Sequence, residues 1–225
     1  MIKITRQLKK FQDEETKIFQ QNLLPNIDPK NIIGVPMGKL RLIAGALRGT
    51  PIEEEFKSEL PHALLEENLV HAFMISEEPN FSKCMIDIEN FLPSVDNWLV
   101  CDSIEPAVFK KHKGELVAYI YQWLDSEHEF TARFAINMLT SLFMGEEYKP
   151  EYVAKLASKK SEQYYVNMAL AEFFATAAAK HWDDVFVYFE MGKLDPWINN
   201  RAIQFAKDKH RISEEQFEAL SKCKR

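Results

Sequence analysis

Glycine and proline are scarce in this chain, with seven glycines and ten prolines among 225 residues. No segment shows the alternation of apolar and polar residues that is typical of an exposed strand. Leu, Ala, Glu, Lys, Phe and Met are plentiful instead, and these residue types favour helix. The composition therefore argues against a sheet and predicts an all-α protein.

Cysteine is also scarce. The three cysteines, Cys84, Cys101 and Cys223, show no C-x-x-C spacing, which argues against a disulfide framework and against a cysteine zinc site. The six histidines form no H-x-x-x-H or H-E-x-x-H pattern, and no glycine-rich phosphate loop is present. We expect reduced thiols, no metal and no cofactor.

Long apolar runs are absent as well. No run approaches the length of a membrane span, and the start MIKITRQLKKFQDEE lacks the apolar core of a signal peptide. The sequence therefore predicts a cytoplasmic protein that does not enter a membrane, and we expect a monomer.

An excess of basic residues is missing too, since the formal net charge is -6. This balance argues mildly against generic nucleic-acid binding. The charge is unevenly distributed, because residues 51–90 carry ten acidic residues against two lysines, whereas residues 201–225 carry seven basic residues against four acidic ones. A basic surface on one side of an acidic protein is compatible with this pattern, although charge runs are usually solvated helix faces.

Prolines and caps divide the chain into about a dozen helices of about 10 to 20 residues. Residues 4–24 are expected to form one helix that Pro25 ends. Later helices are expected to begin at Pro36, Pro51, Pro61, Pro150 and Pro196, and at the capping box Ser213–Gln216. Antiparallel pairs at a spacing of about 35 to 40 residues predict a HEAT-like helical repeat solenoid with a concave face, spanning residues 1–225 as a single domain. A compact irregular bundle is the structural alternative.

The stretch SVDNWLVCDSIEP carries the first candidate site. Trp98 and Asp102 are four residues apart, which on a helix places both side chains on one face, one turn apart. A carboxylate beside a large aromatic ring can stabilise developing positive charge or orient a water molecule. The alternative is structural, with a core tryptophan and a capping aspartate.

Arg133 stands inside the otherwise apolar run TARFAINML. An arginine in that setting either pairs with a buried carboxylate or binds an anion such as phosphate. Further phosphate contacts are predicted if the lysine clusters converge on one face. These clusters are Lys110, Lys111 and Lys113, then Lys155, Lys159 and Lys160, and the basic run 207–211.

Four runs in this order, IIGVPMGKLR, VDNWLVCDSI, TARFAINML and YYVNMALAEFF, resemble the AlkD-type DNA alkylation repair family, the HEAT-like repeat DNA glycosylases. The resemblance covers about residues 15–210 and implies removal of N3- and N7-alkylated purines from duplex DNA without a cofactor. It implies that Asp102 is the catalytic carboxylate, that Trp98 contacts the sugar or the lesion, and that Arg133 holds the phosphodiester. Lys110, Lys111 and Lys159 are the expected further DNA contacts.

Two features depart from the active members of that family. Glu172 occupies the position of a second active-site tryptophan, and a carboxylate cannot stack on a base or sugar. A single helix is expected before IIGVP, where active members have two, so the DNA-gripping N-terminal helices look reduced. Two functions therefore stay open: a DNA glycosylase, or a weak or inactive HEAT-like relative that binds DNA or a protein.

Overall fold

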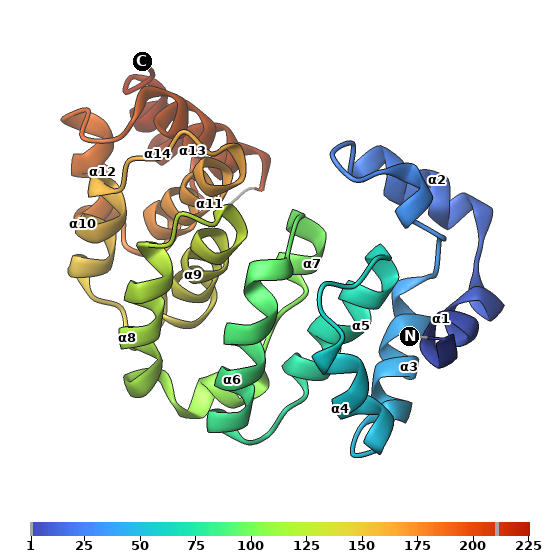
Figure 1. The fold of residues 1–225 in the computed structure, drawn as a ribbon. Helices are drawn as coiled ribbons and strands as arrows, with labels where there is room; N and C mark the ends of the chain where they lie inside the picture. The colour runs from blue at the N-terminus through green and yellow to red at the C-terminus, as the bar shows by residue number, and fades with distance from the viewer. Residues whose placement is uncertain (1, 210–211) are drawn as a thin grey trace. The chain divides into compact units, whose positions relative to one another are not determined.

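The chain is helical throughout the part that its computed structural model describes, residues 2–209 and 212–225 (Figure 1). This part contains fourteen α-helices and four short 3₁₀ segments, and no strand. The prediction of an all-α protein is confirmed.

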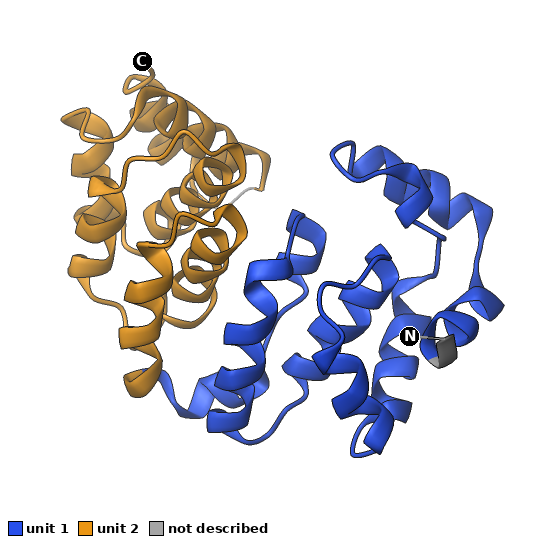
Figure 2. Cartoon of the chain, viewed as in Figure 1, with its two compact units in different colours: residues 1–113 blue, residues 114–225 orange. Residues whose placement is uncertain are grey.

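The chain divides into two compact units, residues 1–113 and residues 114–225, which Figure 2 shows in different colours.

The first unit is built around α5, which is buried along its whole length. This helix packs against α1, α3, α6 and α7. The helices of this unit are α1 (Ile2–Leu8), α2 (Glu14–Leu23), α3 (Met37–Leu47), α4 (Pro51–Ser58), α5 (Leu65–Ser76), α6 (Phe81–Phe91) and α7 (Trp98–Asp102), with 3₁₀ segments η1 (Lys9–Phe11), η2 (Pro29–Asn31), η3 (Leu92–Ser94) and η4 (Ala107–Lys111).

The second unit is built around α11, which lies between α9 and α13 (Figure 1). Its buried face includes five alanines, whose small side chains let neighbouring helices approach closely. A second layer, α10 and α12, packs on the other side of α11, and α14 contacts α12 and α13. The helices of this unit are α8 (Lys113–Leu124), α9 (Glu129–Leu142), α10 (Pro150–Ser158), α11 (Tyr164–Lys180), α12 (Trp182–Glu190), α13 (Pro196–Asp208) and α14 (Glu214–Ser221).

Local signals set most helix starts. Pro51, Pro150 and Pro196 each occupy the first turn of a helix, where a missing N–H costs nothing. Ser213 caps α14 in the predicted capping box: its hydroxyl accepts from the Gln216 N–H, and the Gln216 side-chain oxygen accepts from the Ser213 N–H. These predictions from the sequence are confirmed.

Two predicted boundaries are wrong. Residues 4–24 form two α-helices, because the backbone of Asp13 is extended and its carboxylate caps α2 by accepting from the Thr16 N–H at 2.7 Å. Two helices, α1 and α2, therefore precede IIGVP, and the expectation of a single helix there is wrong. The helix expected at Pro61 begins at Leu65, since Leu64 is extended and its N–H donates to Glu67.

Bonds between neighbouring helix pairs recur at similar sequence separations. Lys57 bonds Asp87 across 30 residues, and Lys159 bonds the Leu124 carbonyl across 35. Lys209 bonds Glu172 across 37 residues. These separations are close to the predicted repeat spacing and are those of stacked helix pairs.

The loop between α2 and α3 is fixed by a buried carboxylate. Glu66 is fully buried and accepts hydrogen bonds from the Ile33 and Gly34 N–H groups at 3.1 and 2.7 Å. Burial raises the pKa of Glu66. Gly34 has a φ of 79°, and its carbonyl accepts from the Asp13 N–H at 2.6 Å. Only glycine fits this position without strain.

Two histidines of the first unit form a hydrogen-bonded pair, in which His71 is buried and His62 is half-buried. The Nε2 of His62 and the Nδ1 of His71 are 2.8 Å apart, so one ring donates a hydrogen bond to the other. Phe56 stacks on His62 and Phe91 stacks on His71, with ring centroids 4.2 and 4.1 Å apart. Burial lowers the pKa of His62 to about 4 and holds the pKa of His71 well below its ordinary value.

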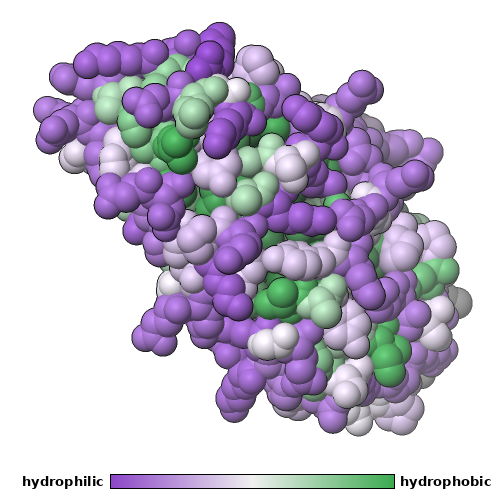
Figure 3. Space-filling model, turned by 90° about the vertical axis from the view of Figure 1, so that its left-hand side faces the viewer, coloured by the Kyte–Doolittle hydropathy of each residue, from purple (hydrophilic) through white to green (hydrophobic). Residues whose placement is uncertain are grey.

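The molecular face in Figure 3 is mostly hydrophilic, with apolar side chains gathered in small patches. Within residues 2–209 and 212–225, no helix combines the length and the apolar character that a membrane crossing requires.

We predict that Gly34→Ala lowers the free energy of unfolding by about 2 kcal/mol or more. A Cβ at this position would lie 2.3 Å from the Asp13 carbonyl oxygen, so the backbone must shift. The measurement is urea unfolding followed by circular dichroism. Gly38→Ala is the matched control, because a Cβ there meets nothing within 4 Å; equal losses in the two variants would contradict the prediction.

We predict that acid destabilises the first unit through the His62–His71 pair. Both pKa values are lowered in the folded state, so below about pH 6.5 the unfolded chain takes up protons that the folded pair resists. The free energy of unfolding should fall by about 2 kcal/mol between pH 8 and pH 5 from His62 alone. Urea titrations of the wild type and of His62→Leu/His71→Leu measure this slope, and an unchanged slope in the double variant would exclude the pair as its cause.

Candidate functional site

Helix α7 carries Trp98 and Asp102 as its first and last residues. The predicted helical spacing is confirmed, so the indole and the carboxylate lie one turn apart on the same face. Both residues are half-buried, while Val100 and Cys101 on the same helix are buried in the core. Val100 and Cys101 thus anchor the short helix in the core, and Trp98 and Asp102 remain partly accessible to solvent.

The N-terminal end of α7 is fixed by Asn97, which is 1% exposed. Its side-chain oxygen accepts a hydrogen bond from the Val100 N–H at 3.0 Å, which is the N-cap bond of this helix. One residue earlier, the carbonyl of Asp96 accepts from the side chain of Asn26 at 3.1 Å. The backbone that leads to Trp98 is therefore tied to the loop after α2.

The other end of α7 is fixed by Ser76, at the end of α5. The Ser76 hydroxyl lies 3.2 Å from the Ser103 carbonyl and accepts a hydrogen bond from the Glu105 N–H at 2.8 Å. The backbone just after Asp102 thus has little freedom, which limits the positions that the carboxylate can take.

Lys110 and Lys111 lie in η4, a few residues further along the first unit, and both are exposed. In the part of the chain that the structure describes, neither lysine pairs with a carboxylate. Their charges are open to solvent and to an anionic partner.

In the second unit, Arg133 on α9 is half-buried, and its Nη1 donates a hydrogen bond to the Tyr165 carbonyl at 3.0 Å. The Tyr165 N–H in turn donates to the Glu129 carboxylate at 2.7 Å. One turn of α9 therefore holds the start of α11 through two side chains, a contact that the sequence did not reveal.

Glu172 on α11 is paired with Lys209, which lies just after α13. The Lys209 Nζ is 2.6 Å from the Glu172 Oε2, and the two side chains are 44% and 26% exposed. The negative charge at the position of the expected tryptophan is therefore offset by a neighbouring ammonium group. Lys209 belongs to the basic run 207–211, of which residues 210 and 211 lie outside the described residues.

Lys159 follows α10 and donates a hydrogen bond to the Leu124 carbonyl at 2.5 Å, where it caps the end of α8. Burial lowers its pKa. Lys155, Lys159 and Lys160 line one cavity of about 360 Å³ together with Asp125. Lys159 is thus engaged by a backbone carbonyl, and the convergence of the three lysine clusters on one face stays a prediction.

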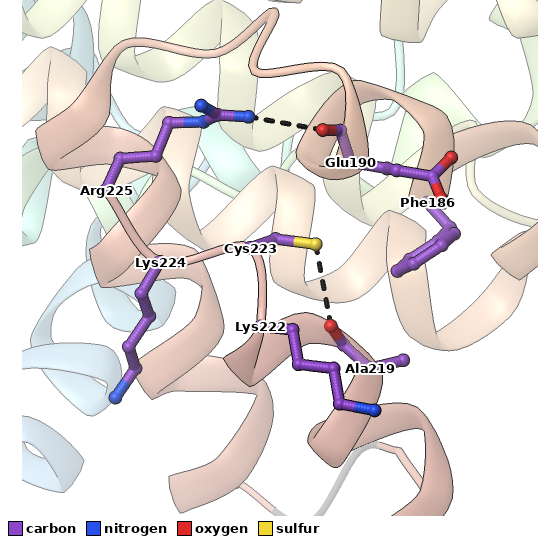
Figure 4. Close-up of a pocket in the computed structure, with 7 residues that line it drawn as sticks. All are labelled: Phe186, Glu190, Ala219, Lys222, Cys223, Lys224 and Arg225. Atoms are coloured by element: carbon purple, nitrogen blue, oxygen red, sulfur yellow. Dashed lines mark hydrogen bonds between the residues drawn. The ribbon is translucent and has the colours of Figure 1, made fainter.

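The chain's last residues line a second cavity, of about 330 Å³, against α12 (Figure 4). The Arg225 guanidinium donates to the Glu190 carbonyl at 3.2 Å, and the Cys223 thiol donates to the Ala219 carbonyl at 3.5 Å. Lys222 and Lys224 extend in different directions, as Figure 4 shows. The cavity is lined by Phe186, Glu190, Ala219, Lys222, Cys223, Lys224 and Arg225.

Metal-ligating residue types are scattered. Among the residues that the structure describes, no group of three or more His, Cys, Asp or Glu side chains is placed to hold a metal ion.

The family model of DNA alkylation repair enzymes matches residues 4–204, and the chain belongs to this family. The match includes α7, Arg133 and Glu172, whereas the residues from Ala219 to Arg225 follow its end. Among curated proteins, no sequence matches the chain.

We predict that Asn97→Ala lowers the free energy of unfolding by about 1 to 2 kcal/mol, because it removes a buried N-cap. Urea unfolding measures the loss. Asn80→Ala is the matched control, since Asn80 makes the same kind of cap bond to Lys83 at 2.9 Å but is exposed. A loss at Asn97 no larger than the loss at Asn80 would contradict the role of burial.

Proposed function

We propose that the protein is a DNA glycosylase that hydrolyses the N-glycosidic bond of N3- or N7-alkylated purines in duplex DNA. The observation that supports this most is the geometry of α7. A tryptophan and a carboxylate share one face of a short helix, and side-chain bonds fix the backbone on both sides of it.

Alkylation at N3 or N7 gives the purine a positive charge. When the bond between C1′ and the purine nitrogen breaks, its electron pair moves to the purine, which leaves as a neutral base. The sugar is then left with oxocarbenium-like positive charge, which the Asp102 carboxylate stabilises. A water molecule adds to C1′ and loses a proton, and Asp102 is placed to orient this water.

Trp98 contributes an aromatic surface one turn from the carboxylate, against which a deoxyribose or a lesion can pack. Arg133 is assigned to a phosphodiester, because the planar guanidinium matches the geometry of phosphate oxygens and can bind two of them with parallel hydrogen bonds. Lys110, Lys111 and Lys159 are assigned to further phosphates. The pairing of Glu172 with Lys209 reduces the repulsion that an unpaired carboxylate would exert on DNA.

The same ion pair favours a second candidate function, a relative that binds DNA or a protein without excising a base. An aromatic wall is absent at Glu172, and the ion pair cannot stack on a base or sugar. This second candidate function predicts that the protein binds the duplex but releases no base from it.

We predict that the wild type releases 7-methylguanine from a duplex oligonucleotide in single turnover, and that Asp102→Asn slows release at least about 100-fold. The amide keeps the shape of the side chain but removes the charge that stabilises the sugar cation. High-performance liquid chromatography of the released base measures the rate.

Glu105→Gln is the matched control, because Glu105 is an exposed carboxylate three residues further along the same segment and should be dispensable. No release by the wild type at high protein concentration and low salt would exclude the glycosylase. Salt-dependent binding of the same duplex would then support the second candidate.

A further inference from the structure

Two large aromatic side chains of the second unit lie in solvent beside each other. Tyr164 is 55% exposed and Trp197 is 42% exposed. Their ring centroids are 5.9 Å apart, with an angle of 66° between the planes. We call these two residues the aromatic ledge. Exposed aromatic surface of this size is costly to keep in water and is typical of binding sites.

The ledge lies where two neighbouring helices begin. Tyr164 is the first residue of α11, and Trp197 is the second residue of α13. Further along, Glu172 on α11 meets Lys209 after α13, so the two helices run in the same direction, side by side (Figure 1). The ledge is therefore one end of a surface that extends along both helices.

The backbone that carries the ledge is held in place. Asp195 accepts hydrogen bonds from the Trp197 and Ile198 N–H groups at 2.9 and 3.3 Å. On α11, the Tyr165 backbone is held by Arg133 and Glu129, and the Tyr165 ring meets the Tyr164 ring at 5.2 Å. The aromatic surface is thus preorganised next to the arginine that the proposed function assigns to phosphate.

Basic groups continue the surface along α13. Trp197, Arg201, Phe205 and Lys209 follow one another at intervals of four residues and so lie on one face. The Arg201 guanidinium and the Lys209 ammonium both lie over the Phe205 ring, at 4.9 and 5.1 Å from its centroid. Arg201 Nε is buried without a hydrogen-bond partner, and no carboxylate of the described residues pairs with Arg201.

Aromatic rings interleaved with basic side chains are the combination that binds single-stranded nucleic acid, because bases stack on rings while phosphates meet cations. A partner protein with a neutral or basic surface would gain no electrostatic attraction from Arg201. We propose that the aromatic ledge binds one unpaired nucleobase by stacking, with Arg201 facing the phosphates next to it. The inference rests on the proposed DNA partner but not on base excision.

The test compares the dissociation constants of three DNA ligands: a fully paired duplex, the same duplex with one unpaired nucleotide, and the single strand. Fluorescence anisotropy of labelled DNA measures them. We predict that the wild type binds the bulged duplex at least about 5-fold more tightly than the paired one, and that Trp197→Ala and Tyr164→Ala each reduce this advantage. Trp197→Phe keeps an aromatic ring and should retain most of the preference for the bulged duplex.

Tyr119→Ala is the matched control, because Tyr119 is an aromatic residue of the same unit with 36% exposure that lies on α8, and its loss should leave the advantage unchanged. Circular dichroism confirms that each variant is folded. Quenching of tryptophan fluorescence by the bulged duplex should be smaller in Trp197→Phe than in the wild type.

The possible failures are distinguishable. Binding of all three ligands without preference for the unpaired nucleotide would overturn the inference and leave the proposed function standing. The absence of binding to any DNA would overturn both. A change in the sedimentation of the free protein on Trp197→Ala would show that the ledge contacts a second copy of this chain, and this too would overturn the inference.

Discussion

The candidate site depends on fixing the backbone of a very short helix at both ends. Five residues cannot form a stable helix alone, because nucleation costs more than one turn of hydrogen bonds returns. Helix α7 persists because Asn97 caps its start, Ser76 of α5 holds the backbone after it, and Val100 is buried in the core. The positions of Trp98 and Asp102 are therefore set by α5, the most buried helix of the first unit.

In the second unit, hydrogen bonds from side chains likewise fix the backbone at the start of a helix, α11. Arg133 and Glu129, one turn apart on α9, hold the carbonyl and the N–H of Tyr165. A charged side chain thus fixes the start of the next repeat, and it leaves the aromatic residue before it in solvent. Arg133 lies on α9, and Tyr164 and Trp197 lie on α11 and α13, and α11 packs against both α9 and α13.

The Glu172–Lys209 pair offsets the negative charge that Glu172 brings to the position of the expected tryptophan. A partly exposed ion pair contributes little to stability, on the order of 0.5 kcal/mol. Its effect is electrostatic, because a carboxylate that would repel DNA is held 2.6 Å from an ammonium group. Aromatic surface is missing at Glu172 itself, yet Tyr164 and Trp197 provide it elsewhere on the same two helices.

Sequence alone determined the helical class, most helix boundaries and the shared face of Trp98 and Asp102, because prolines, caps and helical spacing act over a few residues. It failed at Asp13, where an extended residue docked on Gly34 divides one helical pattern into two helices. Only the tertiary structure decided that Arg133 holds α11 and that Lys209 meets Glu172. Those partners are 32 and 37 residues apart, so their contact depends on how successive helix pairs stack, which no local pattern encodes.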